Sequence, residues 1–461
     1  MSQSAPLGRD TVKTSVLAVG YITLLFFIWA FVTNLIDPLV KCMKLIYTLS
    51  DSEAQLTQFA FFIGYGLTSI PAAWCLSRMG YARSIVIGLM GVVAGCLIAW
   101  STSFSNTYLT VLGGLFVAAS GIALLQVCAN PLIASMGDPA QSHVRLNFAQ
   151  AFNSLGAFLG GVVGAAFLLK GPLFEKNVVI TEAMKANGLS FVTHSYLELA
   201  VALMGFTALV FLARKTISNN APALPEVSVS PLTALSSKWA KLGALGIFLY
   251  VGAEVCVLSG MIFFLEHKQI LNVPSQAAGI VGPLFMLFAM VGRFGGSWLM
   301  GFVKATRLLA IFAGCAAALC VVVITTYHME PVALAGSIAI PTFPGVFHAA
   351  LTTGFIPGCA AILIGLFNSI MFPTIFTITL ERSSAPASAT SGLMCMAICG
   401  GGFISVAYGA AVDAMVHSIP VGARSLAFIV PLACYLYVLW FSRAAAKAPT
   451  HKIEEGVTLA H

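Results

Sequence analysis

The chain has 461 residues, of which 59% are hydrophobic and only 8% are charged. Soluble globular domains carry about 25% charged residues, so this chain has too few polar side chains to cover a water-facing surface, and much of its surface must face lipid. The net charge of +7 does not indicate nucleic-acid binding, because the basic residues stand singly or in pairs between apolar runs. Such a spread is typical of the loop charges that orient a membrane protein. The composition therefore predicts a polytopic, all-α membrane protein.

The first apolar run follows a polar stretch of fifteen residues. It is roughly 25 residues long, whereas a signal peptide has an apolar region of about 7–15 residues, so we expect a retained first span. A transmembrane helix needs about 20 mostly apolar residues. This length predicts twelve spans, near residues 15–39, 54–76, 84–102, 108–133, 147–169, 193–213, 242–265, 276–300, 308–327, 353–379, 389–412 and 422–442.

A polar segment rich in Ser and Pro divides the predicted spans into two sets of six. We expect an N-terminal six-helix bundle over residues 1–213, a cytoplasmic linker over 214–241, and a C-terminal bundle with a short cytoplasmic tail over 242–461. With both termini in the cytoplasm, fifteen Lys and Arg residues fall on inner segments and seven on outer ones, and Arg293 falls at an inner span end. This excess agrees with the positive-inside rule.

One apolar segment does not fit the span pattern. Residues 329–352 are interrupted by Pro331, Pro341 and Pro344, and proline disfavours the interior of a helix. We expect an outer loop that lies against the membrane surface. A thirteenth span is the alternative, and it would move the C-terminal basic residues to the outside.

Two acidic residues lie within the predicted spans. A charged side chain at the bilayer centre is costly and is by default a functional candidate. Asp37 lies in the first span just before a proline, and Glu254 lies about a dozen residues into the seventh. Either carboxylate can couple solute flux to a proton gradient, or ligate sodium. Glu198 and Asp413 lie nearer to predicted span ends, where a structural role is favoured.

Polar side chains, all but one of them amides, recur three or four residues apart in three spans of the first half. This spacing places each set on one helix face. Such amides can join neighbouring helices, but three sets in one half favour a shared polar cavity, and an amide both donates and accepts hydrogen bonds. The sets are Asn34 with Asp37, Gln126 with Asn130, and Asn147 with Gln150 and Asn153.

Aromatic residues stand beside some of these amides. Trp29 lies close to Asn34 in the sequence, and Phe367 directly precedes Asn368. A pyranose has apolar C–H faces and a rim of hydroxyl groups, so flat aromatic rings together with amides suit a sugar. No phosphate-binding loop, paired C-x-x-C motif, zinc-protease motif or nucleophile elbow occurs in the sequence, so we expect neither an enzyme nor a bound cofactor or metal.

Several stretches resemble the fucose permease family of the major facilitator superfamily. They are FFIWAFVTNLIDPLV, LQVCANPLIASMG, RLNFAQAFNSLGAFLG, YVGAEV, VGRFGGSWLM and GLFNSIMFPTIF. The resemblance covers nearly all the spans. It implies twelve helices in a bacterial inner membrane, a central sugar site and alternating access.

The resemblance also assigns roles to individual residues. In the fucose symporters an aspartate in span 1 and a glutamate in span 4 are the key acids. The aspartate matches Asp37, whereas the glutamate position is occupied by Gln126, which cannot titrate. The amides of the span 5 motif match Gln150 and Asn153. With Glu254, this pattern looks more like the glucose, galactose and N-acetylglucosamine branch than the fucose branch.

The sequence therefore predicts a monosaccharide symporter coupled to a cation, H⁺ or Na⁺. Asp37 is the first coupling candidate and Glu254 the second. One copy of the chain would suffice for transport. A transporter of another solute and a non-transporting sugar sensor remain alternatives. The predicted sugar-binding residues are Trp29, Asn34, Gln126, Asn130, Gln150, Asn153, Phe367 and Asn368.

Overall fold

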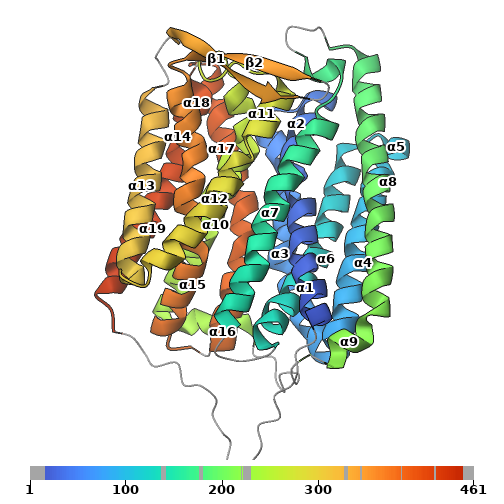
Figure 1. Cartoon of the computed structure of the whole chain (residues 1–461), viewed down its shortest axis with the longest axis vertical. Helices are drawn as coiled ribbons and strands as arrows, with labels where there is room; N and C mark the ends of the chain where they lie inside the picture. The colour runs from blue at the N-terminus through green and yellow to red at the C-terminus, as the bar shows by residue number, and fades with distance from the viewer. Residues whose placement is uncertain are drawn as a thin grey trace, which may run out of the picture.

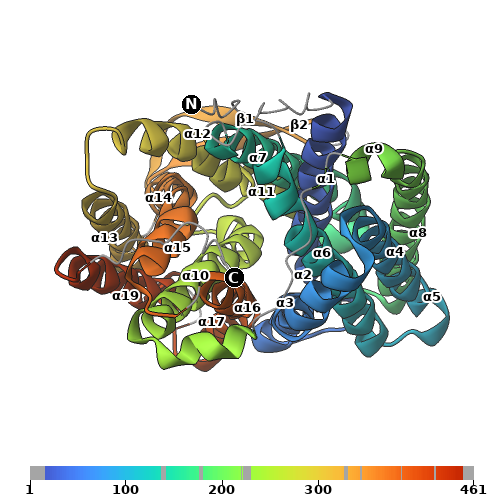
Figure 2. The same ribbon diagram turned by 90° about the horizontal axis from the view of Figure 1, so that it is seen from below.

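The computed structural model describes residues 16–136, 142–175, 180–219, 221, 230–326, 331–342, 345–385, 387–419 and 422–449. Within these residues, twelve helices are long and apolar enough to cross a membrane. They stand side by side in two groups (Figures 1 and 2). The predicted class, an all-α membrane protein with twelve spans, is confirmed.

The first group contains six spans, and the first of them is broken between two helices. Its elements are α1 (Val16–Asn34), α2 (Ile36–Ile46), α3 (Asp51–Met79), α4 (Tyr81–Trp100), α5 (Thr102–Ser105), α6 (Tyr108–Ser135), α7 (Ser142–Leu168), η2 (Pro172–Phe174) and α8 (Glu182–Leu212).

The segment predicted as a linker is partly helical where it is described, with α9 (Arg214–Asn219) and η3 (Pro231–Ser236). The second group follows. Its elements are α10 (Lys238–Glu266), α11 (Ser275–Val281), α12 (Leu284–Leu299), α13 (Ala305–Thr325), β1 (Ala333–Pro341), β2 (Val346–Thr352), α14 (Phe355–Asn368), α15 (Met371–Arg382), α16 (Ala387–Met396), η4 (Ala397–Cys399), α17 (Gly400–Val416), α18 (Ala423–Leu426) and α19 (Ile429–Ala446).

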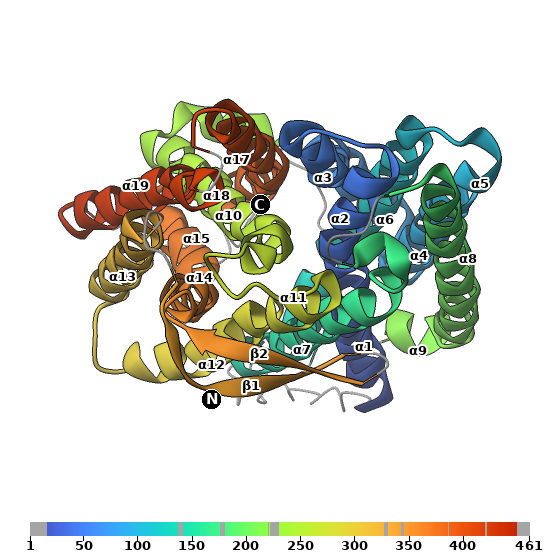
Figure 3. The ribbon, with the colours of Figure 1, turned by 90° about the horizontal axis from the view of Figure 1, so that it is seen from above.

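The segment expected to be a membrane-surface loop contains a β-hairpin instead. Strands β1 and β2 pair antiparallel, with Ser337 opposite Ala350 and Pro341 opposite Val346. Proline is tolerated at a strand end, where no ladder hydrogen bond is lost, so Pro341 is compatible with the hairpin. The hairpin lies across one end of the helices and reaches from the second group toward α7 (Figure 3). We call this the hairpin end. The opposite end, which carries α9 and α16 (Figure 1), is the linker end.

Glycines allow the backbones of α1 and α7 to pack directly against each other. A Cβ atom added at Gly156 would overlap the carbonyl oxygen of Phe27, and one added at Gly160 would overlap that of Phe31. Small residues spaced four apart permit such contact between membrane helices. The same helix touches the other group, because a Cβ at Gly161 would meet the ring of Pro283. Helix α7 therefore packs at once against its own half and against the second half.

We predict that Gly160→Ala destabilises the protein by about 1–3 kcal/mol, because the added methyl group forces the two backbones apart. Thermal unfolding in detergent measures the change. Gly113→Ala is the matched control, since nothing lies within 4 Å of a Cβ added there. Equal unfolding temperatures for the two variants would contradict the packing described here.

Candidate substrate and cation-coupling site

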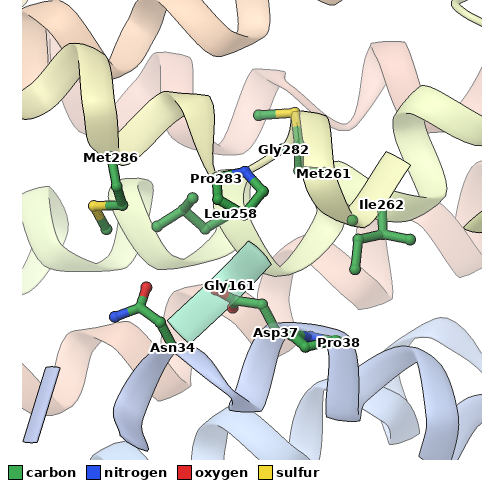
Figure 4. A pocket seen from close by; sticks show the side chains of 11 residues that line it. Asn34, Asp37, Pro38, Gly161, Leu258, Met261, Ile262, Gly282, Pro283 and Met286 are labelled. Carbon is green, nitrogen blue, oxygen red and sulfur yellow. The ribbon is translucent and has the colours of Figure 1, made fainter. Parts of the chain in front are cut away.

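A narrow cavity of about 20 Å³, enough for one water molecule, lies between the two halves (Figure 4). The first half contributes Asn34, Asp37 and Pro38 from the broken span and Gly161 from α7. The second half contributes apolar side chains and glycines. These are Leu258, Met261 and Ile262 of α10, with Gly279, Gly282, Pro283 and Met286 of the α11–α12 span.

Asp37 faces this cavity from the break between α1 and α2. Pro38 has no N–H to donate to the carbonyl four residues before it, so the helix breaks in the turn that precedes the proline, between Asn34 and Ile36. Instead the N–H of Leu35 bonds Val32 at 3.3 Å. The carboxylate Oδ1 of Asp37 accepts a hydrogen bond of 2.8 Å from the buried amide of Gln58 on α3. Gln58, which the sequence pattern did not single out, therefore fixes the orientation of the predicted coupling residue.

Gln126 and Asn130 lie on one face of α6, as their spacing predicted. The amide of Gln126 donates to the hydroxyl of Tyr65 at 3.1 Å. The amide nitrogen of Asn130 donates to the carbonyl of Gln126 at 3.0 Å, and that of Asn34 to the carbonyl of Ala30 at 2.9 Å. Both asparagines therefore bond their own helix through nitrogen, and within the described part of the chain their oxygen atoms remain available as acceptors.

The amides of α7 differ from one another in their contacts. Asn153 donates to the carbonyl of Phe26 at 3.1 Å, which ties α7 to α1. The half-buried side chain of Gln150 makes no hydrogen bond within the described part of the chain, while its backbone carbonyl accepts one from Ser154. Gln150 is thus the amide of this pair that is free to bind a ligand. The side chain of Asn147 lies outside the described residues.

The predicted aromatic contacts are occupied by protein in this structure. Trp29 is 4% exposed, and its ring centroid lies 4.2 Å from that of Phe26. Phe367 makes an edge contact with Phe312 at 5.6 Å. Asn368 is fully buried, and neither polar atom of its side chain makes a hydrogen bond of full geometry within the described residues, although the buried hydroxyl of Tyr435 lies close enough to act on it. A ligand hydroxyl that reached this pair would give the Asn368 amide a better partner.

A charged cluster in the second half joins Glu254 to Arg293. The positive charge of Arg293 and the hydroxyl of Tyr250 both act on the Glu254 carboxylate. Glu254 lies one turn, about 6 Å along the helix, from Leu258, which lines the cavity. Glu254 and Asp37 therefore approach the same interface from opposite halves.

Arg293 also crosses to the first half. Its Nη1 donates to the hydroxyl of Ser154 at 2.9 Å and to the carbonyl of Gln150 at 3.4 Å, both on α7. The sequence placed Arg293 at an inner span end, where it counted only as an orienting charge. The structure instead places it between the two halves, beside the helix that carries the predicted sugar-binding amides.

The hairpin end is closed by contacts between the halves. The first N–H groups of a helix have no partner within it, and here Asp413 of α17 accepts those of Asp51 and Ser52 at 2.9 and 2.8 Å. The Asp51 carboxylate in turn forms ion pairs with Arg424 of the second half at 2.9 Å and with Lys44 of its own half at 2.7 Å. Asp413, for which the sequence favoured only a structural role, thus joins the two halves.

A second contact lies beside it. Lys41 pairs with Glu266 at the end of α10, with 2.5 Å between Nζ and Oε2. The ring of Phe263 faces three cationic groups, Lys41 at 4.6 Å, Arg424 at 5.0 Å and Lys44 at 5.2 Å. Attraction between a cation and an aromatic face is stronger where water is excluded. We call the contacts around Asp51 and Phe263 the hairpin-end latch.

Comparison with known proteins agrees with this architecture. The family model of the Major Facilitator Superfamily matches residues 22–406. The chain is 34% identical to a glucose/galactose transporter of Brucella abortus, with 94% of each protein covered. It is 27% identical to the L-fucose-proton symporter of Escherichia coli, with 93% of this chain and 92% of that protein covered.

Among solved structures, the major facilitator transporter FucP in the outward conformation matches with a TM-score of 0.65 at 26% identity. The match covers 94% of this chain and 99% of FucP. The chain therefore belongs to the major facilitator superfamily, the class of membrane transporters built from two six-helix halves. Within that class, the resemblance to the fucose permease family is confirmed.

We predict that Asp413→Ala loosens the hairpin-end latch. The N–H groups of Asp51 and Ser52 lose a charged acceptor, and a hydrogen bond to a charged group contributes about 1.5–3 kcal/mol. Hydrogen–deuterium exchange at these two amides should then accelerate at least about tenfold. Glu53→Ala is the control, because Glu53 bonds the N–H of Ser50 within the same half. Unchanged exchange at Asp51 and Ser52 would rule out the latch.

Proposed function

We propose that this protein imports a hexose of the glucose or galactose type together with a proton, by alternating access between its two halves. The observation that carries the proposal is the position of Asp37, an acid on a broken helix that faces the second half across a cavity. The named relatives, a glucose/galactose transporter and a fucose-proton symporter, support both the solute class and the cation.

The hairpin end would face the outside of a bacterial inner membrane. The chain enters α1 and leaves α19 at the linker end (Figure 1), where α9 also lies. The excess of Lys and Arg on the segments at that end favours a cytoplasmic position. With the hairpin-end latch closed, this arrangement would correspond to a state that is closed toward the outside.

The sugar would bind among the amides of the first half and the polar groups of the second. Gln150 and the free oxygens of Asn34 and Asn130 suit hydroxyl groups, and Gln126 and Asn153 complete the set. On the other side, the buried amide of Asn368 gains a better partner when a hydroxyl reaches it. Trp29 and Phe367 would contact the sugar ring after a shift in packing, since other aromatic rings cover them here.

Proton binding at Asp37 would permit the loaded carrier to change state. An ionised carboxylate facing Leu258, Met261 and Pro283 opposes close apposition of the halves, because burying a charge among apolar groups is costly. Protonation removes that charge while Gln58 still holds the side chain in place. Gln126 has no group that can take up or release a proton. The second acid near the interface is therefore Glu254, whose charge Arg293 balances.

We predict that Asp37→Asn abolishes accumulation of labelled glucose or galactose in proteoliposomes under an imposed proton gradient. It should spare counterflow exchange, because the neutral amide mimics the protonated acid. Glu254→Gln is the comparison variant. If Glu254→Gln lost accumulation and kept exchange while Asp37→Asn behaved as the wild type, Glu254 would be the coupling residue. A sodium gradient that drives uptake in place of protons would overturn the proposed cation. No flux of either sugar, in vesicles that contain folded protein, would overturn the proposed substrate.

We predict that Gln150→Ala weakens sugar binding by roughly tenfold, since one or two hydrogen bonds of about 1 kcal/mol each are lost. Its unfolding temperature should stay unchanged, because the side chain bonds no described residue. Asn153→Ala should weaken binding and also lower the unfolding temperature, since it breaks the bond to Phe26. Equilibrium binding and thermal unfolding of the purified variants separate the two effects. Unchanged affinity in Gln150→Ala would remove that residue from the site.

A further inference from the structure

Helix α8 carries a carboxylate about midway between the basic residues that flank its span. Near the hairpin end, Lys185 of α8 bonds the hydroxyl of Thr48, and at the linker end α9 begins at Arg214. At 1.5 Å per residue, Glu198 lies about 20 Å from the level of Lys185 and about 24 Å from that of Arg214. The sequence placed Glu198 nearer a span end because the predicted span began at residue 193. The helix begins at Glu182 instead.

This carboxylate faces outward, away from the interface between the halves. Helix α8 lies at the edge of the first half (Figures 2 and 3). Glu198 is exposed and makes no hydrogen bond or ion pair within the described part of the chain. One turn closer to the hairpin end, His194 is also exposed, and its Nδ1 meets only Ser190 of the same helix, whose carbonyl is 2.7 Å away. Two ionisable side chains on one helix face thus point into the membrane.

Lipid does not satisfy these groups. The hydrocarbon core is about 30 Å thick, and Glu198 falls inside it wherever the core lies between the levels of Lys185 and Arg214. Acyl chains offer no hydrogen-bond donor. A membrane helix that presents polar side chains at this depth is instead satisfied by another helix, which hydrogen-bonds across the contact. The partner must therefore be a protein segment with a donor at the depth of His194 and Glu198.

We infer that α8 packs against α8 of a second copy, with Glu198 paired to His194 of the partner subunit and His194 to the partner's Glu198. All copies insert with the same orientation, so a twofold axis along the membrane normal brings two parallel α8 helices together, and each contact occurs twice. The residues are four apart, and parallel helices commonly pair opposite charges at such an offset. The α8 face is therefore complementary to itself.

The same face of α8 permits close approach of a second helix on the linker-end side of Glu198. Ala202, Gly205 and Ala208 are exposed on α8, and nothing lies within 4 Å of a Cβ added at Gly205. Small residues at a helix surface are typical of contacts between membrane helices. The sequence alone gave no reason to expect more than a monomer. The proposed transport site lies wholly within one chain, so this dimer contact is independent of the proposed function.

Counting photobleaching steps tests the dimer. The full chain carries one fluorophore fused to its C-terminus and is reconstituted at low density in liposomes. We expect two steps per particle for the wild type and mainly one step for Glu198→Gln and for His194→Glu, with at least a tenfold weaker dimerisation constant. The double swap, His194→Glu with Glu198→His, restores the complementary pair and should restore two steps. Glu182→Gln makes the same chemical change outside the bilayer and should leave the dimer intact.

Two results would overturn the inference. One is a wild type that bleaches in single steps at every density. The other is a dimer that persists in both single variants, which would place the contact elsewhere. A dimer that the double swap fails to restore would likewise count against the pairing of Glu198 with His194 and would give α8 another partner. Thermal unfolding of each variant, expected to match the wild type in detergent, shows that loss of the dimer is not loss of the fold.

Discussion

Asp51 stands where the two halves meet at the hairpin end, and its contacts close that end. The start of α3 offers N–H groups to Asp413 of the other half, while the Asp51 carboxylate holds Arg424. Each partner is anchored on a different helix bundle, so these bonds break when the bundles separate while the bonds inside each bundle stay intact. Polar contacts of this kind suit a reversible closure, because water replaces them when the end opens.

The two halves contribute different chemistry to the interface. The first half supplies amides of α1, α6 and α7, most of which donate to backbone carbonyls of α1 or α6, and the acid Asp37 with its partner Gln58. The second half supplies the Glu254 and Arg293 charges and the buried amide of Asn368. Arg293 hydrogen-bonds both halves, through Ser154 on α7 and the carbonyl of Ser369 at the end of α14. A change in the relative position of the halves therefore alters the surroundings of Glu254 directly.

The spans and the acid at the cavity could be predicted from the sequence, because both follow from the cost of burying polar groups in lipid. The hairpin could not, since a strand pair with apolar residues on both faces has no alternating pattern, and its prolines suggested a loop. Gln58 and Tyr65 could not be predicted as site residues, because their partners Asp37 and Gln126 are distant in the sequence. Arg293 lies where its predicted span placed it, but its contacts with α7 are with residues distant in the sequence. Glu198 was misplaced because the predicted span began at residue 193, whereas α8 begins at Glu182. A short error along a helix of 1.5 Å per residue moves a charge between headgroup and hydrocarbon.

The β-hairpin extends the second half beyond the ends of its helices. Its strands bond each other along their length, and Ile340 and Ala349 are buried while most neighbouring residues are exposed. The hairpin therefore projects an exposed surface that belongs to one half and reaches over the other. An antibody fragment raised against it would follow the motion of the second half from a single side of the membrane, and would add mass to a transporter that otherwise has little outside the bilayer.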